Sequence, residues 1–262
     1  MKNVLLYGGG TQSTGLLLMI LDGVIDVKID DAIYSDTFSE PKFVDNYILK
    51  VKDYVYKKYG FIINIVNKPG QGLEYDIKNN TGERIASLPL FTANGGMIRR
   101  QCTMEYKIIP INKYIKQKYE VGRKIKKSIP LINRLFGISL DEIERCKQST
   151  DWWAINDYPL VMARMYRHEV INYIAKNHPQ LSHPPKSSCV FCPFHNDQYW
   201  RELKKKHHIE FERACNIDEL IRNNSKLSNR CYLHKSMIPL RNVNFELKQI
   251  NIFGECEGYC GI

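Results

Sequence analysis

The sequence predicts an α/β protein: a doubly wound, mostly parallel sheet followed by a smaller helical region that carries cysteines. Three observations predict it. Short apolar runs alternate with helix-length segments over the first 65 residues, the order that builds a parallel sheet with right-handed crossovers. A glycine-rich turn follows the first apolar run. Beyond Pro184-Pro185, Cys, His, Trp and Lys dominate and the periodicity becomes helical.

The first 65 residues are expected to read strand, helix, strand, helix, strand. Each expected strand is a short, mostly apolar run, and each expected helix carries apolar side chains at helical spacing until a glycine ends it. The strands are predicted at 3–7, 31–35 and 61–66, and the helices between the glycine turn and residue 23 and over 41–59.

The rest of the chain is less regular. Residues 67–97 are rich in Gly and Asn and are predicted to form a long loop. Helices are predicted at 105–119, 140–147 and 167–177, and a further strand at 129–137. We place a boundary near residue 165, which predicts an α/β domain over 1–165 and a helical region with a cysteine-containing tail over 166–262.

Size and composition narrow the class of protein. The 262 residues are 44% hydrophobic and 25% charged, which is enough for a folded core without disulfides and excludes a disordered chain. No apolar run approaches the ~20 residues that span a bilayer. Met1-Lys2 leads into a strand rather than a signal peptide. We therefore expect a cytoplasmic protein without a membrane partner, whose eight cysteines stay reduced.

The glycine turn is the first candidate site. We call residues 8–14 the glycine loop: Gly8, Gly9, Gly10, Thr11, Gln12, Ser13 and Thr14. A strand, a glycine turn and a helix start are suited to phosphate, with Ser13 and Thr14 expected to cap the helix and donate hydroxyls. The spacing matches neither a Walker A loop nor the dinucleotide fingerprint. A tight strand-to-helix turn without a ligand is the alternative.

Asp36 follows the second predicted strand. Ligands collect at the carboxyl ends of parallel strands, so its carboxylate is expected near the glycine loop. There it would accept a hydrogen bond from a ribose hydroxyl or help to hold Mg²⁺. The alternative is a capping role at the start of the next helix.

Arg99 and Arg100 stand before a predicted helix and next to Cys102. Two guanidinium groups can bind phosphate bidentately, and Lys107 is expected on the same side. A solvated surface pair is the alternative.

Cys189-Val-Phe-Cys192-Pro193 has the spacing of a metal or cluster site. A zinc site or a pair of buried thiols are the alternatives. His195, three residues further on, is the histidine that this spacing singles out.

Together these motifs resemble the PP-loop ATP pyrophosphatases of the adenine-nucleotide α-hydrolase superfamily, a Rossmann-like fold of the HUP type. The chain is most similar to the phosphoadenosine phosphosulfate (PAPS) reductase-like branch. The glycine loop carries the resemblance, with Gln12 where the usual Ser-Gly-Gly-x-Asp-Ser pattern has Asp, which argues against a direct magnesium role for that position. The other matching segments are Tyr34-Ser35-Asp36-Thr37 with Glu40-Pro41, and Arg99-Arg100-Gln101-Cys102 with Glu105-Tyr106-Lys107 and Pro110.

The resemblance implies an enzyme that binds ATP or a related adenine nucleotide through the glycine loop, Asp36, Arg99 and Arg100. Ser13, Arg100 and Lys107 would be the catalytic groups, with Mg²⁺ as a further cofactor. A [4Fe–4S] cluster would be held by Cys102, Cys189, Cys192 and a fourth ligand, for which Cys260 is favoured over Cys256 and Cys231. Zinc is the rival occupant of that site.

By the same resemblance, the reaction would be adenylyl transfer or sulfur chemistry, with sulfur inserted into a nucleic acid from a donor that the sequence does not name. One alternative is a sulfonucleotide reductase with Cys260 as nucleophile and a thioredoxin-like reductant. Another is a non-catalytic nucleotide-binding protein with structural zinc. The sequence leaves the oligomeric state open.

The net charge of +10 is concentrated in two segments. Such clusters are typical of surfaces that bind tRNA or DNA, and solvated helix faces are the alternative. Residues 112–134 carry one acid, Glu120, against Lys113, Lys116, Lys118, Arg123, Lys124, Lys126, Lys127 and Arg134. The second cluster is Arg201, Lys204, Lys205, Lys206, His207 and His208.

Overall fold

The structure is a computed structural model that describes residues 1–79, 87–121, 130–224, 227 and 229–246. The chain forms two compact units that alternate along the sequence. Unit 1 comprises Met1–Ser35, Phe43–Val66 and Pro110–Ser187, and unit 2 comprises Asp36–Lys42, Asn67–Ile109 and the described residues from Ser188 onward. The division near residue 165, which rests on motif content and not on packing, stays a prediction.

Unit 1 is built on a parallel sheet, which confirms the predicted fold class. The strands run in the order β3-β2-β1-β5-β6, and β1 pairs in parallel with both β2 and β5, as β5 does with β6. The strand order reverses between β1 and β5, so the loops that follow these two strands meet at the switch point of the sheet. The bounds are β1 Lys2–Leu6, β2 Asp31–Asp36, β3 Ile63–Asn67, β5 Ile132–Phe136 and β6 Ala154–Asp157.

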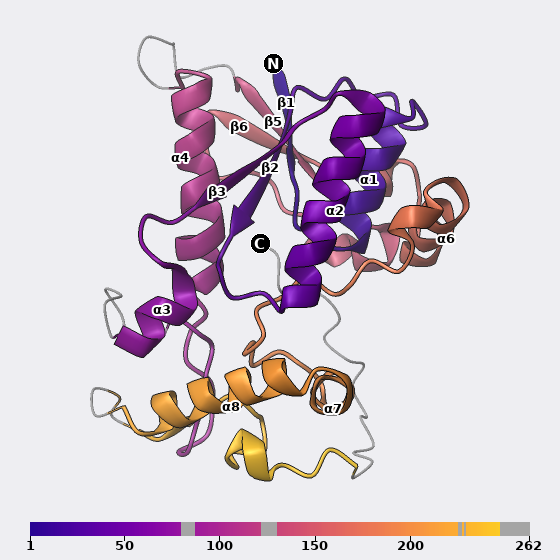
Figure 1. Cartoon of the computed structure of the whole chain (residues 1–262). Helices are drawn as coiled ribbons and strands as arrows, with labels where there is room; N and C mark the ends of the chain where they lie inside the picture. The colour runs from indigo at the N-terminus through magenta and orange to yellow at the C-terminus, as the bar shows by residue number, and fades with distance from the viewer. Residues whose placement is uncertain (80–86, 122–129, 225–226, 228, 247–262) are drawn as a thin grey trace. The chain divides into compact units, whose positions relative to one another are not determined.

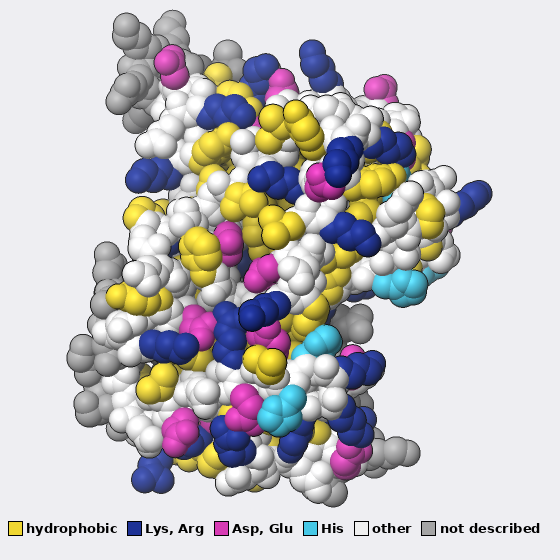
Figure 2. Space-filling model, in the orientation of Figure 1, with side chains coloured by type: hydrophobic (Ala, Val, Ile, Leu, Met, Phe, Trp, Pro, Cys, Tyr) yellow, Lys and Arg dark blue, Asp and Glu magenta, His cyan; other side chains and the backbone are white. Residues whose placement is uncertain are grey.

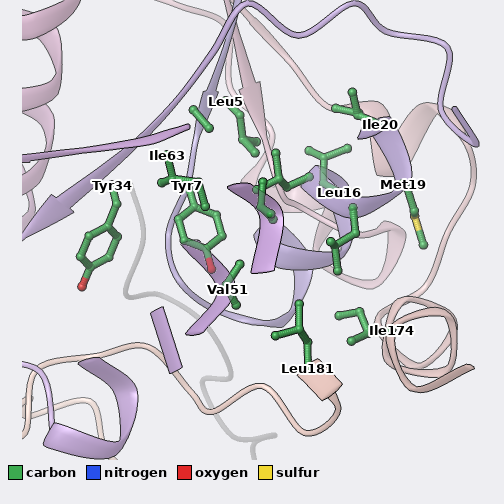
Figure 3. Packing of buried hydrophobic residues seen from close by; sticks show 14 of the residues in the cluster. Leu5, Tyr7, Leu16, Met19, Ile20, Tyr34, Val51, Ile63, Ile174 and Leu181 are labelled. Atoms are coloured by element: carbon green, nitrogen blue, oxygen red, sulfur yellow. The ribbon is translucent and has the colours of Figure 1, made fainter. Parts of the chain in front are cut away.

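Helices cover both faces of this sheet, as a doubly wound fold requires (Figure 1). On one face, α1 and α2 pack with α6 around a core that includes Leu5, Leu16 and Ile174 (Figure 3). On the other face, α4 packs Ile111 and Ile115 on Val4. The helices are α1 Thr11–Leu21, α2 Lys42–Tyr59, α4 Ile109–Lys118 and α6 Arg167–Asn177.

Successive residues of β1 enter opposite cores, because side chains alternate along a strand. Leu5 lies in the core under α1, whereas Val4 lies in the core under α4, and both side chains are fully buried. A strand buried on both faces reads as a continuous apolar run, which is the pattern that the sequence shows at residues 3–7.

Short helical turns complete unit 1 at the loops beyond β5 and β6. The first of them is 3₁₀-helical where a regular helix was expected over 140–147. They are the 3₁₀ turns Leu140–Arg145 and Pro179–Leu181 and the helix α5 Pro159–Met162.

Unit 2 has little sheet and is mainly helical. Its two short strands, β4 Phe91–Thr92 and β7 Cys231–Tyr232, pair in antiparallel fashion. Its helices are α3 Gly72–Asn79, α7 Asp197–Lys206 and α8 His208–Arg222, with a π-helical turn at Met104–Ile108 and a 3₁₀ turn at Leu240–Asn242.

One expectation about the segment before residue 120 was wrong. Residues 67–97 were expected to be loop throughout, yet α3 forms there because Leu73 and Ile77, four residues apart, bury one side of the helix. The helix expected over 105–119 is confirmed, since the chain is helical from Met104 to Lys118, with a π-helical turn at Met104–Ile108 directly before α4. In the part of the chain that the structure describes, no helix has the length and apolar character needed to cross a membrane.

Candidate functional site

The glycine loop joins β1 to α1 within unit 1. Gly9 has a φ of +74°, which side chains of other residues rarely allow, and a Cβ there would lie 3.0 Å from Ile48 Cδ1. Helix α1 begins at Thr11 with Gly10 as its N-cap, so no side chain caps its first N–H groups, and its first turn carries no acid. This end of α1 is therefore suited to an anion.

The two hydroxyls of the loop do not cap the helix, contrary to expectation. Ser13 Oγ donates to the Gly10 carbonyl at 3.2 Å. Thr14 is fully buried, and its Oγ1 lies 3.1 Å from the Tyr7 hydroxyl, a phenol whose pKa burial raises. Ser13 stays at the first turn of α1, whereas the hydroxyl of Thr14 belongs to the core.

Gln12 is held by side chains from far along the chain. Its Nε2 donates to Glu142 Oε2 at 2.9 Å, and its Oε1 accepts from Arg167 Nη1 at 2.8 Å. Glu142 is buried and also pairs with Arg145 at 2.8 Å; burial raises the pKa of Glu142 and the Arg145 guanidinium opposes that shift. Both ends of the Gln12 amide are thus occupied within unit 1.

The sequence reasoning missed Glu142, Arg145 and Arg167. The signal that could have found them is topological: β1 and β5 flank the switch point, so the segment after β5 must approach the glycine loop. The structure shows how closely it does so. A Cβ on Gly137 would lie 2.6 Å from both the N and the Cα of Ser13.

A second candidate site lies within unit 2. It is a hollow of about 410 Å³ that is open to solvent, and we call it the thiol hollow. Five of the predicted site residues meet there, although they come from separate segments of the sequence. It is lined by Thr37, Leu73, Pro89, Arg100, Cys102, Thr103, Lys107, Ser188, Cys189, Cys192 and Phe194.

The positive charge of the thiol hollow comes from Arg100 and Lys107. The Arg100 guanidinium lies over the Phe194 ring, 5.8 Å from its centroid. Lys107 Nζ lies 3.6 Å from Oε1 of Glu40, a carboxylate that is 1% exposed. Arg99 is exposed and does not line the hollow, so the two adjacent arginines are not placed together as a bidentate pair.

Two further hydroxyls line the hollow. Thr37 Oγ1 and Ser188 Oγ are buried, and neither has a hydrogen-bond partner among the described residues. Buried hydroxyls in proteins usually have a hydrogen-bond partner. Both of these hydroxyls are therefore available to form a hydrogen bond with a group bound in the hollow. Asp36, next to Thr37, uses its carboxylate locally and accepts the Phe38 amide at 2.7 Å. Because α2 begins at Lys42, this contact is not the helix cap that was the alternative for Asp36.

The thiols of the hollow do not by themselves make a metal site. Across the described ranges, no three His, Cys, Asp or Glu side chains are placed to hold one metal ion. Cys102, Cys189 and Cys192 line the same hollow, but the favoured fourth ligand, Cys260, lies outside the described residues, as does Cys256. The donor chemistry suits iron or zinc, whereas the observed grouping is incomplete.

The other described cysteines do not line the hollow, and Cys215 and Cys231 are buried. Burial raises the pKa of Cys215 to about 12 and also raises the pKa of Cys146 and Cys231. Cys231, an alternative fourth ligand, lies buried in β7 and its Sγ donates to the Asn229 carbonyl at 3.4 Å.

The basic segment 112–134 is not a continuous charged surface among its described members. Arg134 was counted as a surface charge, which was wrong: it is 6% exposed in β5 and pairs with Asp151 at 2.8 Å. Lys118 pairs with Asp31, and Lys116 lies 5.2 Å from the centroid of the Trp153 ring. Four members lie outside the described residues: Arg123, Lys124, Lys126 and Lys127.

The second basic cluster is partly neutralised inside unit 2. Lys205 pairs with Glu246, and Arg201 donates to the Phe245 carbonyl. On the face that Figure 2 shows, Lys and Arg side chains are scattered among acids rather than gathered into one patch. These contacts and this face give no support to a nucleic-acid partner.

Comparisons with known proteins add a fold-level likeness. No protein-family model matches the chain, and no curated protein does. Among solved structures, the chain is similar to phosphoadenylyl-sulfate (PAPS) reductase from Candida auris in its phosphate complex. The two share 16% sequence identity with a TM-score of 0.45, over 68% of this chain and 73% of that chain. At this level the likeness assigns no activity, so function is argued from the two sites above.

Proposed function

We propose that the glycine loop of unit 1 binds the phosphates of ATP or a related adenine nucleotide, and that the chain is an enzyme which uses this nucleotide in sulfur chemistry. The observation that carries the proposal is the geometry at the switch point. A positive φ at Gly9 turns the chain into α1, whose first N–H groups have no side-chain cap and whose first turn contains no acidic residue.

These groups would hold a phosphate by charge and by hydrogen bonds. The N–H groups of the first turn of α1 point at an anion placed before the helix, and the partial positive charge of the helix end adds to them. The Ser13 hydroxyl stands on this turn, and Arg167, held against Gln12 at 2.8 Å, brings a full positive charge to it. Phosphate transfer chemistry relies on such positioning and charge stabilisation.

Unit 2 would supply the second set of charged groups. Arg100 and Lys107 line the thiol hollow together with the Thr37 hydroxyl. In the proposed enzyme they would stabilise negative charge on an anionic group bound in this hollow. Asp36 and Arg99 are also proposed to bind the nucleotide, but neither of them lines the hollow.

Gln12 bears on the choice between the two catalytic alternatives. Cleavage of ATP between its α and β phosphates draws on a metal ion, and the PP-loop pattern has an acid where this chain has Gln12. That amide is occupied at both ends by Glu142 and Arg167. This favours reduction of a sulfonucleotide, the second candidate, over adenylyl transfer to a nucleic acid, which also lacks support from the described charged surface.

The binding experiment compares two glycines of unit 1 that share a positive φ. Gly9→Ala places a Cβ 3.0 Å from Ile48, whereas a Cβ on Gly23, at φ +75°, meets nothing within 4 Å. We expect calorimetry to show adenine nucleotide binding that falls at least about tenfold in Gly9→Ala, or 1.4 kcal/mol. Gly23→Ala should leave it unchanged. Equal losses in both variants, or no binding to the unmodified chain, would reject the proposal.

The product assay separates the two reactions. Pyrophosphate released from ATP would support adenylyl transfer, and sulfite released from a sulfonucleotide with a thiol reductant would support reduction. Ser13→Ala should weaken either activity. Loss of sulfite release, but not of nucleotide binding, in Cys260→Ser would support the tail cysteine as nucleophile.

A [4Fe–4S] cluster is a further part of the proposed function. If Cys260 is not the nucleophile, it would complete a [4Fe–4S] site with Cys102, Cys189 and Cys192, and this group supplies electron transfer when bound. Anaerobic purification tests it: a brown protein that loses its iron in Cys189→Ser supports the cluster. A colourless protein with stoichiometric zinc supports the structural alternative.

A further inference from the structure

We infer that Cys189 and Cys192 are a redox-active dithiol, which closes to an intramolecular disulfide by exchange with a small disulfide. The inference does not depend on nucleotide binding, and it is an alternative to the cluster considered above, because the same two thiols cannot be joined in a disulfide and ligate iron at once. It starts from the incomplete metal grouping, since three thiols line one hollow and yet no three ligand side chains gather among the described residues.

The backbone brings the two cysteines within disulfide range. The Cys192 amide donates to the Cys189 carbonyl at 3.1 Å, which closes a β-turn over residues 189–192. A β-turn keeps its first and fourth Cα atoms within about 7 Å. Disulfides join Cα atoms about 4.4–6.8 Å apart, so the pair can be linked without unfolding this turn. The six described cysteines form no disulfide in the structure.

The turn is held in place from three directions. The Val190 amide donates to the Ser39 carbonyl at 2.8 Å. The His195 ring donates from Nε2 to the Cys189 carbonyl at 2.9 Å, and its amide donates to the Cys192 carbonyl at 3.1 Å. The His195 ring also stacks on Tyr199 with centroids 3.8 Å apart. A pinned turn holds the two thiols in one relative position, which favours an intramolecular over an intermolecular bond.

The two thiols differ in access, as attacking and resolving thiols do. Cys189 is half-buried at the thiol hollow, whereas Cys192 is only 7% exposed. An incoming disulfide therefore reaches Cys189 first. Arg100 and Lys107 line the same hollow. Cys215 and Cys231 are buried away from the hollow, and each lacks a cysteine at this spacing.

The exchange balances in two steps. The Cys189 thiolate attacks one sulfur of a disulfide RSSR, which forms a mixed disulfide and releases one thiolate. The Cys192 thiolate then attacks the Cys189 sulfur, which closes the pair and releases the second thiolate. Two electrons pass from the pair to RSSR, and the protons of the two cysteine thiols go to the two released thiolates.

The test uses the full chain, reduced and then equilibrated with oxidised and reduced glutathione in varying ratio. After alkylation and digestion, both cysteines lie on one tryptic peptide, 187–201. As the buffer becomes more oxidising, we expect the doubly alkylated form of this peptide to be replaced by an unalkylated form that is two hydrogen atoms lighter than the free dithiol peptide. Cys192→Ser should stop at a glutathione adduct on Cys189, and Cys189→Ser should give neither the adduct nor the internal bond.

Cys215→Ser is the matched control, since it removes a buried thiol of unit 2 and should leave the reaction unchanged. The inference is overturned if Cys189 and Cys192 are alkylated separately at every ratio, or if Cys189 links to another cysteine instead. It is equally overturned if the purified chain carries iron or zinc that is lost in both serine variants and protects the pair from oxidation. Nucleotide binding, measured in parallel, reports on the proposed function and not on this pair.

Discussion

Unit 1 and unit 2 build their candidate sites in opposite ways. In unit 1 the site is backbone: a glycine turn and a helix end, set on a sheet with apolar cores on both faces. In unit 2 the site consists of side chains, namely the thiols and positively charged groups that line the thiol hollow. Many of the contacts that stabilise unit 2 are polar. A site made of backbone groups is expected to be disrupted by substitutions that add side-chain atoms. A site made of side chains is expected to be disrupted by substitutions that remove them.

The contacts that stabilise the two units also differ, since they are polar in unit 2 and closely packed apolar contacts in unit 1. In unit 2, Asp218 is 1% exposed and accepts the amides of Leu233 and Leu240 at 2.9 and 3.0 Å while it pairs with Arg222. In unit 1, α1 and α6 approach so closely at Gly15 that a Cβ would lie 2.2 Å from Val170 Cγ1. The following predictions test whether polar contacts in unit 2 and close packing in unit 1 carry the stability.

The largest effect is expected at Asp218. Asp218→Ala leaves two buried amides and a guanidinium without their acceptor, which should lower the free energy of unfolding by about 3 kcal/mol. Asp218→Asn keeps the shape and one acceptor oxygen and should cost less. Urea denaturation followed by circular dichroism measures both, and a cost under about 1 kcal/mol for Asp218→Ala would refute the polar account of unit 2.

The next effect is at the α1–α6 contact. Gly15→Ala should destabilise the chain by about 2 kcal/mol, because the new methyl overlaps Val170. In a Val170→Ala background the same change should be neutral or stabilising, since Ala favours a helix over Gly by about 1 kcal/mol. A thermodynamic cycle over the four chains measures the coupling, and additive effects would show that the helices do not meet as described.

Acid should weaken both units through one buried histidine in each. Burial lowers the pKa of His178 in unit 1 and of His234 in unit 2, although Asp22 and Asp197 oppose the shift. A folded pKa below the unfolded value of about 6.5 means that the unfolded chain binds the proton more readily. The stabilisation is therefore fully present above about pH 6.5. Below that pH the free energy of unfolding falls, by no more than about 1.4 kcal/mol per pH unit for each histidine.

The variants His178→Asn and His234→Asn should each flatten the dependence of unfolding free energy on pH between 7.5 and 5.5. His168→Asn, at an exposed position of α6, is the control. A steeper slope in either buried variant would contradict the assigned direction of the pKa shift.

The smallest effect is expected at a surface ion pair of unit 1. Lys57 and Asp53 stand one helical turn apart on α2, 2.8 Å between Nζ and Oδ2, and both are exposed. Lys57→Ala should change the unfolding free energy by no more than about 0.5 kcal/mol, since water screens the pair. A cost above 1 kcal/mol in thermal melts would show that polar contacts also stabilise unit 1.

Sequence patterns predicted the structure correctly where it depends on residues that are close together in the sequence. The strand at 3–7, the glycine turn and the helix at 167–177 were predicted within a few residues of their observed positions. Arg134 shows where such patterns mislead. Because its neighbours in the sequence include many lysines, it was counted as a surface charge. In β5, however, its side chain is buried and its guanidinium pairs with Asp151. Only pairing between strands could show this.

The sequence by itself determined the α/β class and the segments that carry chemistry, because apolar periodicity and glycine turns act over a few residues. The tertiary structure alone decided that Gln12 meets Glu142 and Arg167, 130 and 155 positions away, and that Thr37, Cys102 and Cys189 line one hollow. The physical reason is that burial and pairing depend on which segments become neighbours in space, and spacing along the chain does not contain that information.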